Sequence, residues 1–261
     1  MAEWEEEGRL KKEAEEERKR KAAERKAESD RASREYWSKV WAGDEPQADE
    51  GSIDWFSSLL RQRTVVPEAV RLTKYPEMAA EYLAKAYRVE VERMGGTFSA
   101  DAYTRRAIVD VARWLTTHTK PGLMLRGYVG VGKTTVMRAA AQVLAIVEGR
   151  TMKIVDARDI AAAAKADERR FKEYADAPLL GLDDLGTEPS VVKSYGNELS
   201  PVAELLTRRY AARRFTVITT NLAAGDNGDE LRDVYGDRLF DRIREMFNII
   251  TYDAKQKSYR Q

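Results

Sequence analysis

Apolar residues recur in two rhythms along this chain, and the change of rhythm divides it. From residue 122 onward, short apolar runs alternate with stretches whose apolar residues repeat at helical spacing, as at 135–147 and 157–175. The short runs predict five strands, at 122–126, 152–155, 179–182, 216–219 and 248–251. Alternating strands and helices pack as a mostly parallel sheet with helices on both faces. This part of the chain therefore predicts a three-layer α/β domain.

The region before this domain has only the helical rhythm. Residues 52–96 carry apolar side chains at helical spacing, interrupted by Pro67 and Pro76, and predict a small helical N-terminal region. Two glycines end the pattern, and Ser99 is expected to cap the next helix. We therefore place a domain boundary before residue 97 and assign 97–261 to the α/β domain.

The first residues have a different composition again. Residues 1–42 begin as a run of Glu, Lys, Arg and Ala, in which pairs such as Glu16 and Arg20 favour a solvated helix. This charged arm ends in an aromatic cluster, Tyr36, Trp37, Val40 and Trp41. The cluster is expected either to anchor a partner or to pack on the adjoining domain. Residues 43–51 contain proline and several acids, and predict a linker.

Composition limits the classes of function. The 45 Lys and Arg residues nearly balance the 44 Asp and Glu residues, so the net charge of +1 does not indicate nucleic acid binding by itself. The chain has no cysteine, which excludes disulfides and thiolate metal sites. No apolar run approaches the length of a membrane span, and no hydrophobic signal core opens the chain. We therefore expect a cytoplasmic protein without membrane contact.

The sequence GYVGVGKT, from Gly127 to Thr134, matches the phosphate-binding pattern GxxxxGK[ST]. It lies between a predicted strand and a predicted helix, which is the context that the motif requires. Glycines let the backbone direct N–H groups at a phosphate beside the positive end of a helix. Lys133 is expected to contact the β- and γ-phosphates of ATP, and Thr134 to bind Mg²⁺. The predicted nucleotide-binding residues are Gly127, Gly130, Val131, Gly132, Lys133, Thr134 and Thr135.

Two acids follow the third predicted strand. Four apolar residues, 179–182, lead into Asp183 and Asp184, the pattern of a Walker B strand. Asp183 is expected to hold Mg²⁺, and Asp184 to orient or deprotonate the attacking water. The second acid is commonly Glu, and the shorter Asp184 predicts slow hydrolysis. Glu188 is the competing candidate for the base.

Polar residues near the ends of later elements complete the candidate chemistry. Asn221 follows the fourth predicted strand and is expected either to hydrogen-bond the γ-phosphate or lytic water or to begin a turn. Arg238 and Arg242 share one face of a predicted helix. A guanidinium can stabilise the charge of a transferring phosphoryl group. The alternative is ion pairing with nearby acids, namely Asp237, Asp241 and Glu245.

Taken together, four motifs resemble the AAA+ ATPases of the DnaC/IstB group, the bacterial replicative-helicase loaders and transposition helper ATPases. The motifs are GYVGVGKT, LLGLDDLGTE, TVITTNL and YGDRLFDRI, and the tail also resembles that of the loaders. The resemblance covers roughly residues 97–261. It implies a P-loop AAA+ three-layer fold with a parallel five-stranded sheet, preceded by an α-helical N-terminal region. About ten residues follow the last predicted strand, so a full C-terminal lid is not expected.

The resemblance also implies roles for single residues. Asn221 takes the place of sensor 1, Arg242 that of sensor 2, and Arg238 that of an arginine finger acting on ATP of a neighbouring subunit. It further implies ATP-dependent oligomerisation, a helicase-binding N-terminal region and contact with single-stranded DNA. The family places a DNA-facing helix where this chain has a basic run, although a plain exposed helix is the favoured interpretation: Lys165, Arg169, Arg170 and Lys172. A second basic cluster is interpreted as a solvated face rather than a subunit interface: Arg208, Arg209, Arg213 and Arg214.

The expected function is therefore that of an ATP-hydrolysing replication protein that loads a ring helicase onto single-stranded DNA. One alternative is a transposition helper ATPase that polymerises on duplex DNA. Another is a nucleotide-gated module that binds a partner with little turnover, which the shorter Asp184 would suit.

Overall fold

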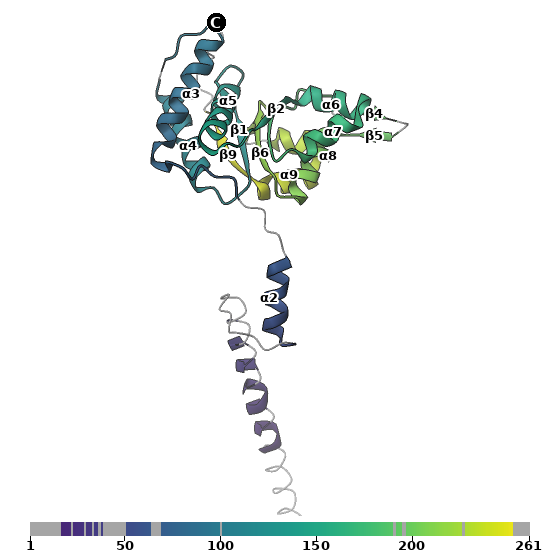
Figure 1. Ribbon diagram of the computed structural model, residues 1–261. Helices are drawn as coiled ribbons and strands as arrows, with labels where there is room; N and C mark the ends of the chain where they lie inside the picture. The colour runs from purple at the N-terminus through teal and green to yellow at the C-terminus, as the bar shows by residue number, and fades with distance from the viewer. Residues whose placement is uncertain are drawn as a thin grey trace, which may run out of the picture. The chain divides into compact units, whose positions relative to one another are not determined.

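The computed structural model describes two compact units, Met1–Val66 and Pro67–Gln261 (Figure 1). The described residues are 17–38 with gaps at 22, 29, 33 and 36–37, then 51–63, 69–99, 101–189, 192–194, 197–225 and 228–252. The predicted aromatic cluster and most of the predicted linker lie outside them, as do residues 253–261. No helix in the described ranges is long and apolar enough to cross a membrane.

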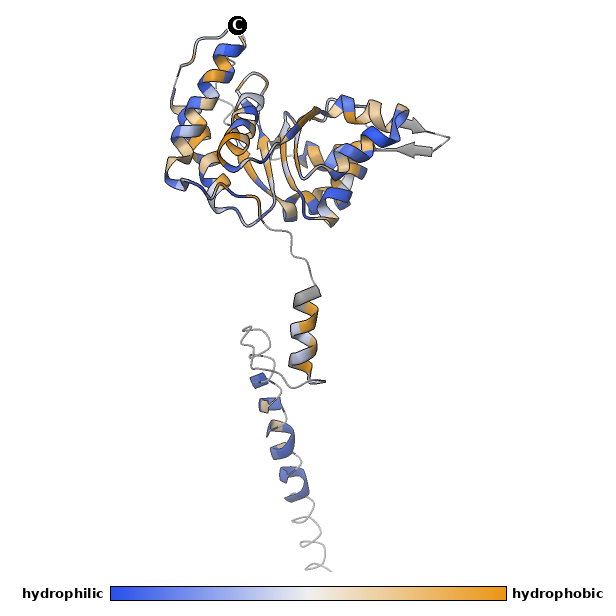
Figure 2. Cartoon of the chain, viewed as in Figure 1, coloured by the Kyte–Doolittle hydropathy of each residue, from blue (hydrophilic) through white to orange (hydrophobic). Residues whose placement is uncertain are grey.

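The first unit is helical where it is described. Residues between 17 and 38 carry ion pairs one helical turn apart, such as Lys21 to Glu17 at 2.7 Å. Both side chains are exposed, so the pair adds little stability. Helix α2, Ile53–Arg63, begins where Ser52 Oγ accepts a hydrogen bond from Trp55 N at 3.1 Å. Its apolar residues lie along one side of the helix (Figure 2).

The second unit is built on a parallel sheet of five strands. They are β1 Gly122–Arg126, β2 Lys153–Asp156, β3 Leu179–Leu185, β6 Phe215–Thr220 and β9 Phe247–Thr251, in the spatial order β2-β3-β6-β1-β9. The strands agree with those predicted, and β3 continues through the two acids. Since all five run in the same direction, their carboxyl ends lie at one edge of the sheet.

Helices cover both faces. They are the short η1 Pro76–Met78, then α3 Ala79–Arg93, α4 Ala102–Thr117, α5 Lys133–Val143 with the π-helical turn η2 Leu144–Glu148, α6 Ala157–Ala166, α7 Glu168–Asp176, α8 Pro201–Ala211 and α9 Glu230–Met246. Two small hairpins complete the unit: β4 Val192–Ser194 with β5 Asn197–Leu199, and β7 Ala224–Gly225 with β8 Gly228–Asp229.

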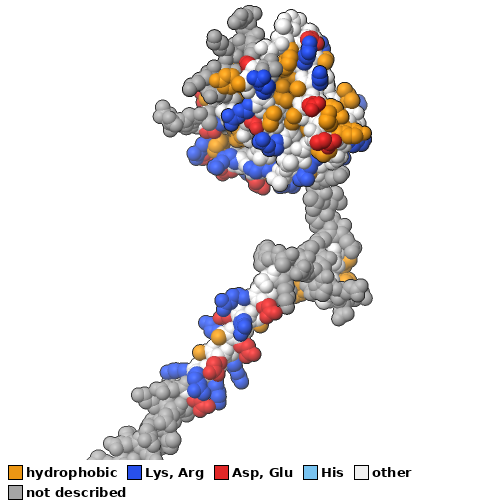
Figure 3. Space-filling view, turned by 90° about the vertical axis from the view of Figure 1, so that its left-hand side faces the viewer, with side chains coloured by type: hydrophobic (Ala, Val, Ile, Leu, Met, Phe, Trp, Pro, Cys, Tyr) orange, Lys and Arg blue, Asp and Glu red, His pale blue; other side chains and the backbone are white. Residues whose placement is uncertain are grey.

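Successive side chains of β1 point into two different cores. Leu123 and Leu125 pack with buried residues of α3, α4 and α5, whereas Met124 packs with those of α6, α8 and α9. This alternation is that of a strand buried on both faces. It confirms the predicted three-layer α/β fold. The outer surface of the α3 and α4 side carries basic, acidic and apolar side chains (Figure 3).

Short polar residues set the helix starts. Asp101 accepts a hydrogen bond from Thr104 N at 2.7 Å and caps α4, so the predicted cap at Ser99 is wrong. Asp167 caps α7 through Arg170 N at 3.0 Å. The single helix predicted at 157–175 is therefore divided into α6 and α7.

The boundary between the two units differs from the predicted one. We predicted it before residue 97, whereas α3 lies within the second unit, with Leu83 fully buried in the core. Leu72 N donates to Leu115 O at 2.9 Å, and the Glu148 carboxylate accepts from Thr73 N at 2.6 Å. Residues 67–96 therefore belong to the α/β unit, because their apolar side chains are needed to cover its sheet.

The interpretation of the second basic cluster as a solvated face is wrong for Arg209, whose side chain has no exposed surface. Its guanidinium donates to Thr216 Oγ1, Phe215 O and Ala177 O at 2.7–2.9 Å, and to two further carbonyls of the α7 end. Burial lowers the pKa of Arg209 to about 9, which leaves it charged at neutral pH. The residue ties α8 to β6 and to the approach to β3.

Candidate active site

The turn between β1 and α5 has the form that its glycines predict. Gly132 has φ of 88° and caps α5, which begins at Lys133. A Cβ atom at Gly132 would also collide with the Tyr87 hydroxyl of α3. Both the left-handed backbone and the close contact require glycine here. The first N–H groups of α5 are thus presented at the edge of the sheet, where they suit an anion.

The Lys133 ammonium is buried behind this turn. Its Nζ donates to Gly127 O at 2.8 Å, to Tyr128 O at 2.7 Å and to Asn221 Oδ1 at 2.7 Å. All three acceptors are neutral. A phosphate oxygen is a stronger acceptor for an ammonium than a neutral oxygen, so these contacts can be exchanged for a nucleotide. Asn221, which follows the fourth predicted strand, is thus brought to the lysine.

The two predicted metal residues meet directly. Thr134 Oγ1 donates to Asp183 Oδ1 at 2.8 Å, and Thr219 Oγ1 donates to the same oxygen at 2.6 Å. The described residues contain no group of three or more His, Asp or Glu that could hold a metal by themselves. Mg²⁺ commonly takes one or two protein oxygens together with phosphate and water oxygens. Thr134 and Asp183 fit that pattern when a nucleotide supplies the remaining oxygens.

Asp184 has a strained backbone. Its φ is 55°, in the left-handed region, and its N–H donates to Thr219 Oγ1 at 2.8 Å. The pairing of β3 with β6 is irregular between Leu182 and Leu185, around this residue. Strain of this kind is often found at functional sites. Here it occurs at an acidic residue that lines the cavity at the P-loop.

That cavity has a volume of about 500 Å³. On one side it is lined by the P-loop, both aspartates and Asn221. On the other side lie α3 and the segment after it, including Tyr87, Glu90 and Phe98. Its volume lies within the range of small-molecule sites. Sequence reasoning missed the contribution of α3, because the helical spacing of its apolar residues does not say which surface they cover.

Glu188, the competing base, lies elsewhere. Its carboxylate accepts from Gly186 N at 2.9 Å and from the Tyr235 hydroxyl of α9, and only 8% of the residue is exposed. Burial and the hydrogen bond to Glu188 raise the pKa of Tyr235. Glu188 is not among the residues of the cavity wall, whereas Asp184 is.

The two arginines of α9 also lie outside the cavity. Gly236, with φ of 78° and ψ of 166°, interrupts the helix just before them. Arg238 is exposed, and in the part of the chain that the structure describes it makes no hydrogen bond or ion pair. Arg242 donates to Thr207 Oγ1 at 2.9 Å and lies over the Tyr210 ring of α8. The structure therefore does not bring either guanidinium to the P-loop of its own chain.

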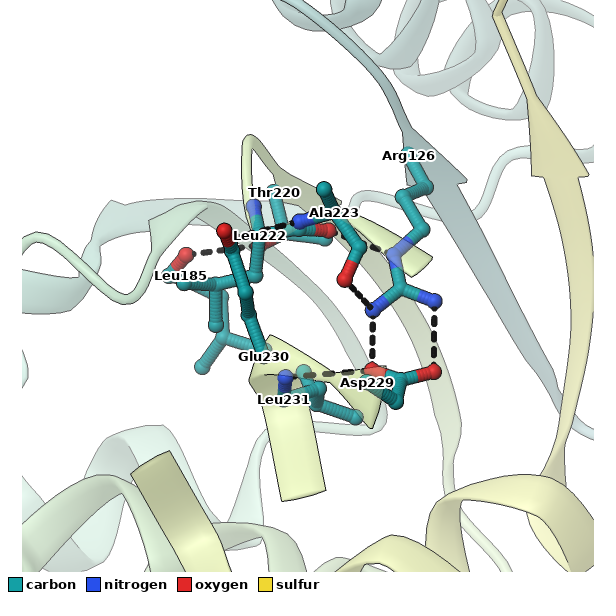
Figure 4. A network of polar contacts seen from close by, with 8 residues as sticks. All are labelled: Arg126, Leu185, Thr220, Leu222, Ala223, Asp229, Glu230 and Leu231. Atoms are coloured by element: carbon teal, nitrogen blue, oxygen red, sulfur yellow. Dashed lines mark hydrogen bonds and ion pairs between the residues drawn. The ribbon is translucent and has the colours of Figure 1, made fainter. Parts of the chain in front are cut away.

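A residue that sequence reasoning did not single out joins the site to α9. Arg126, the last residue of β1, is 4% exposed and pairs with Asp229, the cap of α9 (Figure 4). The pair holds the pKa of the Asp229 carboxyl below its ordinary value. The only sequence signal was a charged residue closing an otherwise apolar strand.

The first basic run is exposed, as its favoured interpretation predicts. Its members lie on α6 and α7: Lys165, Arg169, Arg170 and Lys172. Arg169 lies near Glu173 at 3.5 Å, so acids interrupt the basic surface.

Comparison with known proteins gives the following matches. The model of the family "IstB-like ATP binding protein" matches residues 39–261. No curated protein matches the chain. Among solved structures, the DnaC helicase loader is 22% identical, with a TM-score of 0.49 over 60% of this chain and 93% of that one. DnaI is 23% identical, with a TM-score of 0.45 over 61% and 87%. AMPPCP-bound DnaA from Aquifex aeolicus is 20% identical, with a TM-score of 0.44 over 62% and 50%.

Proposed function

The chain belongs to the family of IstB-like ATP-binding proteins, and from this premise we propose that it hydrolyses Mg²⁺–ATP at a site shared between subunits. The observation that carries the proposal is the meeting of Lys133, Thr134 and Asp183 at one edge of the sheet. Asn221 completes the set through its contact with Lys133. These side chains come from three adjacent strands or from the P-loop beside them, as binding at the carboxyl edge of a parallel sheet requires.

Each of these residues has a role that its contacts support. The amides of residues 130–135 and Lys133 bind the β- and γ-phosphates in place of the neutral oxygens that now hold the ammonium. Thr134 and Asp183 would hold Mg²⁺, which would supply charge neutralisation of the phosphates. A single ligand, Mg²⁺–ATP, thus accounts both for the buried ammonium of Lys133 and for the Asp183 oxygen that Thr134 and Thr219 share.

We assign the positioning of the lytic water to Asp184 rather than Glu188. Asp184 is among the residues that line the cavity, whereas the Glu188 carboxylate is engaged by Gly186 and Tyr235. Removing a positioned general base typically costs two to four powers of ten in rate, so Asp184→Asn should lower kcat by about 10²–10⁴-fold. Nucleotide affinity should stay near its original value. If Asp184→Asn protein binds its partner as the wild type does, and both proteins turn over ATP equally slowly, the nucleotide-gated module is favoured instead.

Arg238 is proposed to act on the nucleotide of a neighbouring subunit. It is exposed and is not among the residues that line the cavity of its own chain, as expected of an arginine finger supplied to a second molecule. A guanidinium in this role is worth about 10³–10⁵-fold in turnover. The site is thus incomplete in a monomer, and assembly is required for hydrolysis.

Mixing two inactive variants tests the shared site. Lys133→Ala protein cannot hold the phosphates but still offers Arg238, and Arg238→Ala protein keeps its phosphate site but offers no finger. We expect each alone to release phosphate at a small fraction of the original rate, and the mixture to recover turnover. Nucleotide affinity of Arg238→Ala should be almost unchanged. A mixture that stays as inactive as its components contradicts the shared site.

For the cellular role we propose the loading of a ring helicase onto single-stranded DNA, on the motif resemblance and the tail that follows β9. The family match over 39–261 also favours a second candidate, a transposition helper that polymerises on duplex DNA. Phosphate release should be measured with single-stranded and with duplex DNA of equal nucleotide content. Stimulation by single strands supports the loader, and stimulation by duplex alone supports the transposition helper.

A further inference from the structure

We propose that Arg126 is a positioning residue that fixes the helix carrying Arg238 to the nucleotide site of its own subunit. The inference rests on the proposed function, because Arg238 must act on a neighbour for its position to matter. Arg126 precedes the P-loop directly, and its partner Asp229 begins the helix that leads to Arg238.

The guanidinium of Arg126 has four contacts on one side of the sheet edge (Figure 4). Nη1 donates to Asp229 Oδ2 at 2.9 Å, and Nη2 donates to Asp229 Oδ1 and to Ala223 O, the latter at 3.0 Å. Nε donates to Leu222 O. Bidentate pairing with a carboxylate fixes orientation as well as distance. Arg126 thus fixes the loop after Asn221 and the first residue of α9 at the same time.

The loop and the helix are also bonded to each other. Ala223 N donates to Glu230 Oε2 at 2.7 Å, and Glu230 N donates to Ala223 O at 3.1 Å. Asp229 Oδ1 accepts from Leu231 N at 3.1 Å and caps the helix. Since Asn221 contacts Lys133 one residue before this loop, a shift of the lysine or of Asn221 on nucleotide binding reaches α9 through few bonds.

A second attachment holds the other end of the same helical segment. Tyr235 donates to Glu188, whose carboxylate also accepts from Gly186 N just after β3. Residues 230–235 are therefore fixed at one end to β1 and at the other to the segment after β3, and Gly236 then breaks the helix. Arg238 lies two residues beyond that break. Glu188 in this arrangement positions α9 and has no part in proton transfer.

An ion pair whose arginine is buried, even with a partly exposed aspartate, is a costly way to join two elements. Well-packed apolar residues of similar volume often stabilise a fold as well or better. A bidentate charged pair directly beside the P-loop fits a requirement for one fixed orientation. Arg126 and Asp229 therefore set where Arg238 is presented to the neighbouring subunit.

The test uses the mixture of Lys133→Ala and Arg238→Ala subunits. In that mixture only the Lys133→Ala subunit donates a finger, and only the Arg238→Ala subunit uses its nucleotide. Asp229→Asn is added to one or the other, because asparagine keeps the oxygen that caps Leu231 N but loses the charge. In the donor it should lower kcat of the mixture on the order of tenfold to a hundredfold, as misplaced groups do, with KM unchanged. In the acceptor the loss of kcat should be much smaller.

Asp233→Asn in the donor is the matched control. Asp233 lies on the same helix, is exposed, and in the described ranges takes part in no hydrogen bond or ion pair. It undergoes the same change of charge, and we expect kcat of the mixture to stay within about twofold, as for surface substitutions. Arg126→Gln in the donor should reproduce Asp229→Asn, and the double variant should lose no more than either single one.

The outcomes separate the inference from the function on which it rests. If the mixture without Asp229→Asn fails to recover turnover, the shared site is wrong and the inference falls with it. If that mixture works, equal kcat with and without Asp229→Asn in the donor overturns the inference alone. A loss as large in the acceptor as in the donor also overturns it, because the pair would then serve its own pocket. Arg126→Gln in the donor and in the acceptor gives the same comparison if Asp229→Asn does not fold.

Discussion

Arg126 and Arg209 are both buried arginines, yet they lie in regions of the molecule with different tasks. Arg209 is bound by four backbone carbonyls and one hydroxyl, which belong to strand β6 and to the end of α7 and the segment after it. Arg126 is bound by two carbonyls and a carboxylate at the edge where the nucleotide site lies. Neutral acceptors within a core hold a fold together. A charged acceptor at the start of another helix also fixes direction, which a catalytic assembly needs.

The largest effect on stability is expected at Arg209. Arg209→Met removes all five hydrogen bonds and leaves buried acceptors without donors, each worth about 1–3 kcal/mol if unsatisfied. We expect the free energy of unfolding to fall by about 3–5 kcal/mol, measured by urea denaturation, while kcat of the folded protein changes little.

Arg208→Met is the control for that substitution. Arg208 is the preceding residue, is exposed and pairs with Glu204 at the surface, so its loss should cost about 0.5 kcal/mol or less. Equal losses for Arg208→Met and Arg209→Met would contradict the role given to burial.

At Arg126 we expect a smaller loss of stability and a larger loss of turnover than at Arg209. Arg126→Met should cost less stability, about 1–2 kcal/mol, because Asp229 is partly exposed and water can replace part of the lost pair. Turnover of the assembled protein should fall about tenfold or more, since Arg238 is no longer fixed in place. Urea denaturation and phosphate release should be measured on both variants. If the comparison is right, Arg209→Met loses more stability and Arg126→Met loses more turnover. A parallel pattern, in which the less stable variant is also the less active, would remove the distinction.

Lowering the pH should produce the smallest difference in stability between the region of Arg126 and the region of Arg209. Arg126 lowers the pKa of Asp229 in the folded state, so the contribution of this pair is fully present above the ordinary carboxyl pKa. It is lost as pH falls through the lowered value. The free energies of unfolding of the wild type and of Asp229→Asn should therefore converge as the pH is lowered from 6 toward about 3. The difference between the wild type and Arg209→Met should show no such change, because none of the five Arg209 acceptors titrates in that range.

The sequence predicted what depends on local pattern. The strands, the strand–loop–helix setting of GYVGVGKT and the meeting of Thr134 with Asp183 all follow from short motifs and the parallel sheet. The sequence did not distinguish Asp184 from Glu188, because that choice depends on where Tyr235 packs. Ser99 and Asp101 are both suitable caps, and only the packing of α4 selects the second.

Arg209 shows the main reason for the remaining errors. In the sequence it belongs to a cluster of four arginines before an apolar strand, and arginines are rarely buried without a partner. Its burial depends on carbonyls at the end of α7, more than thirty residues earlier in the chain. Such acceptors carry no sequence signal, since every residue has a carbonyl.

The environment of Lys133 has a consequence for how affinity arises. Lys133 is 5% exposed and its ammonium already donates to three protein oxygens, so folding has removed much of its hydration. A nucleotide entering the site meets a cation that needs little further dehydration. The cost of dehydrating this lysine thus lowers the stability of the fold and does not lower the affinity for the nucleotide.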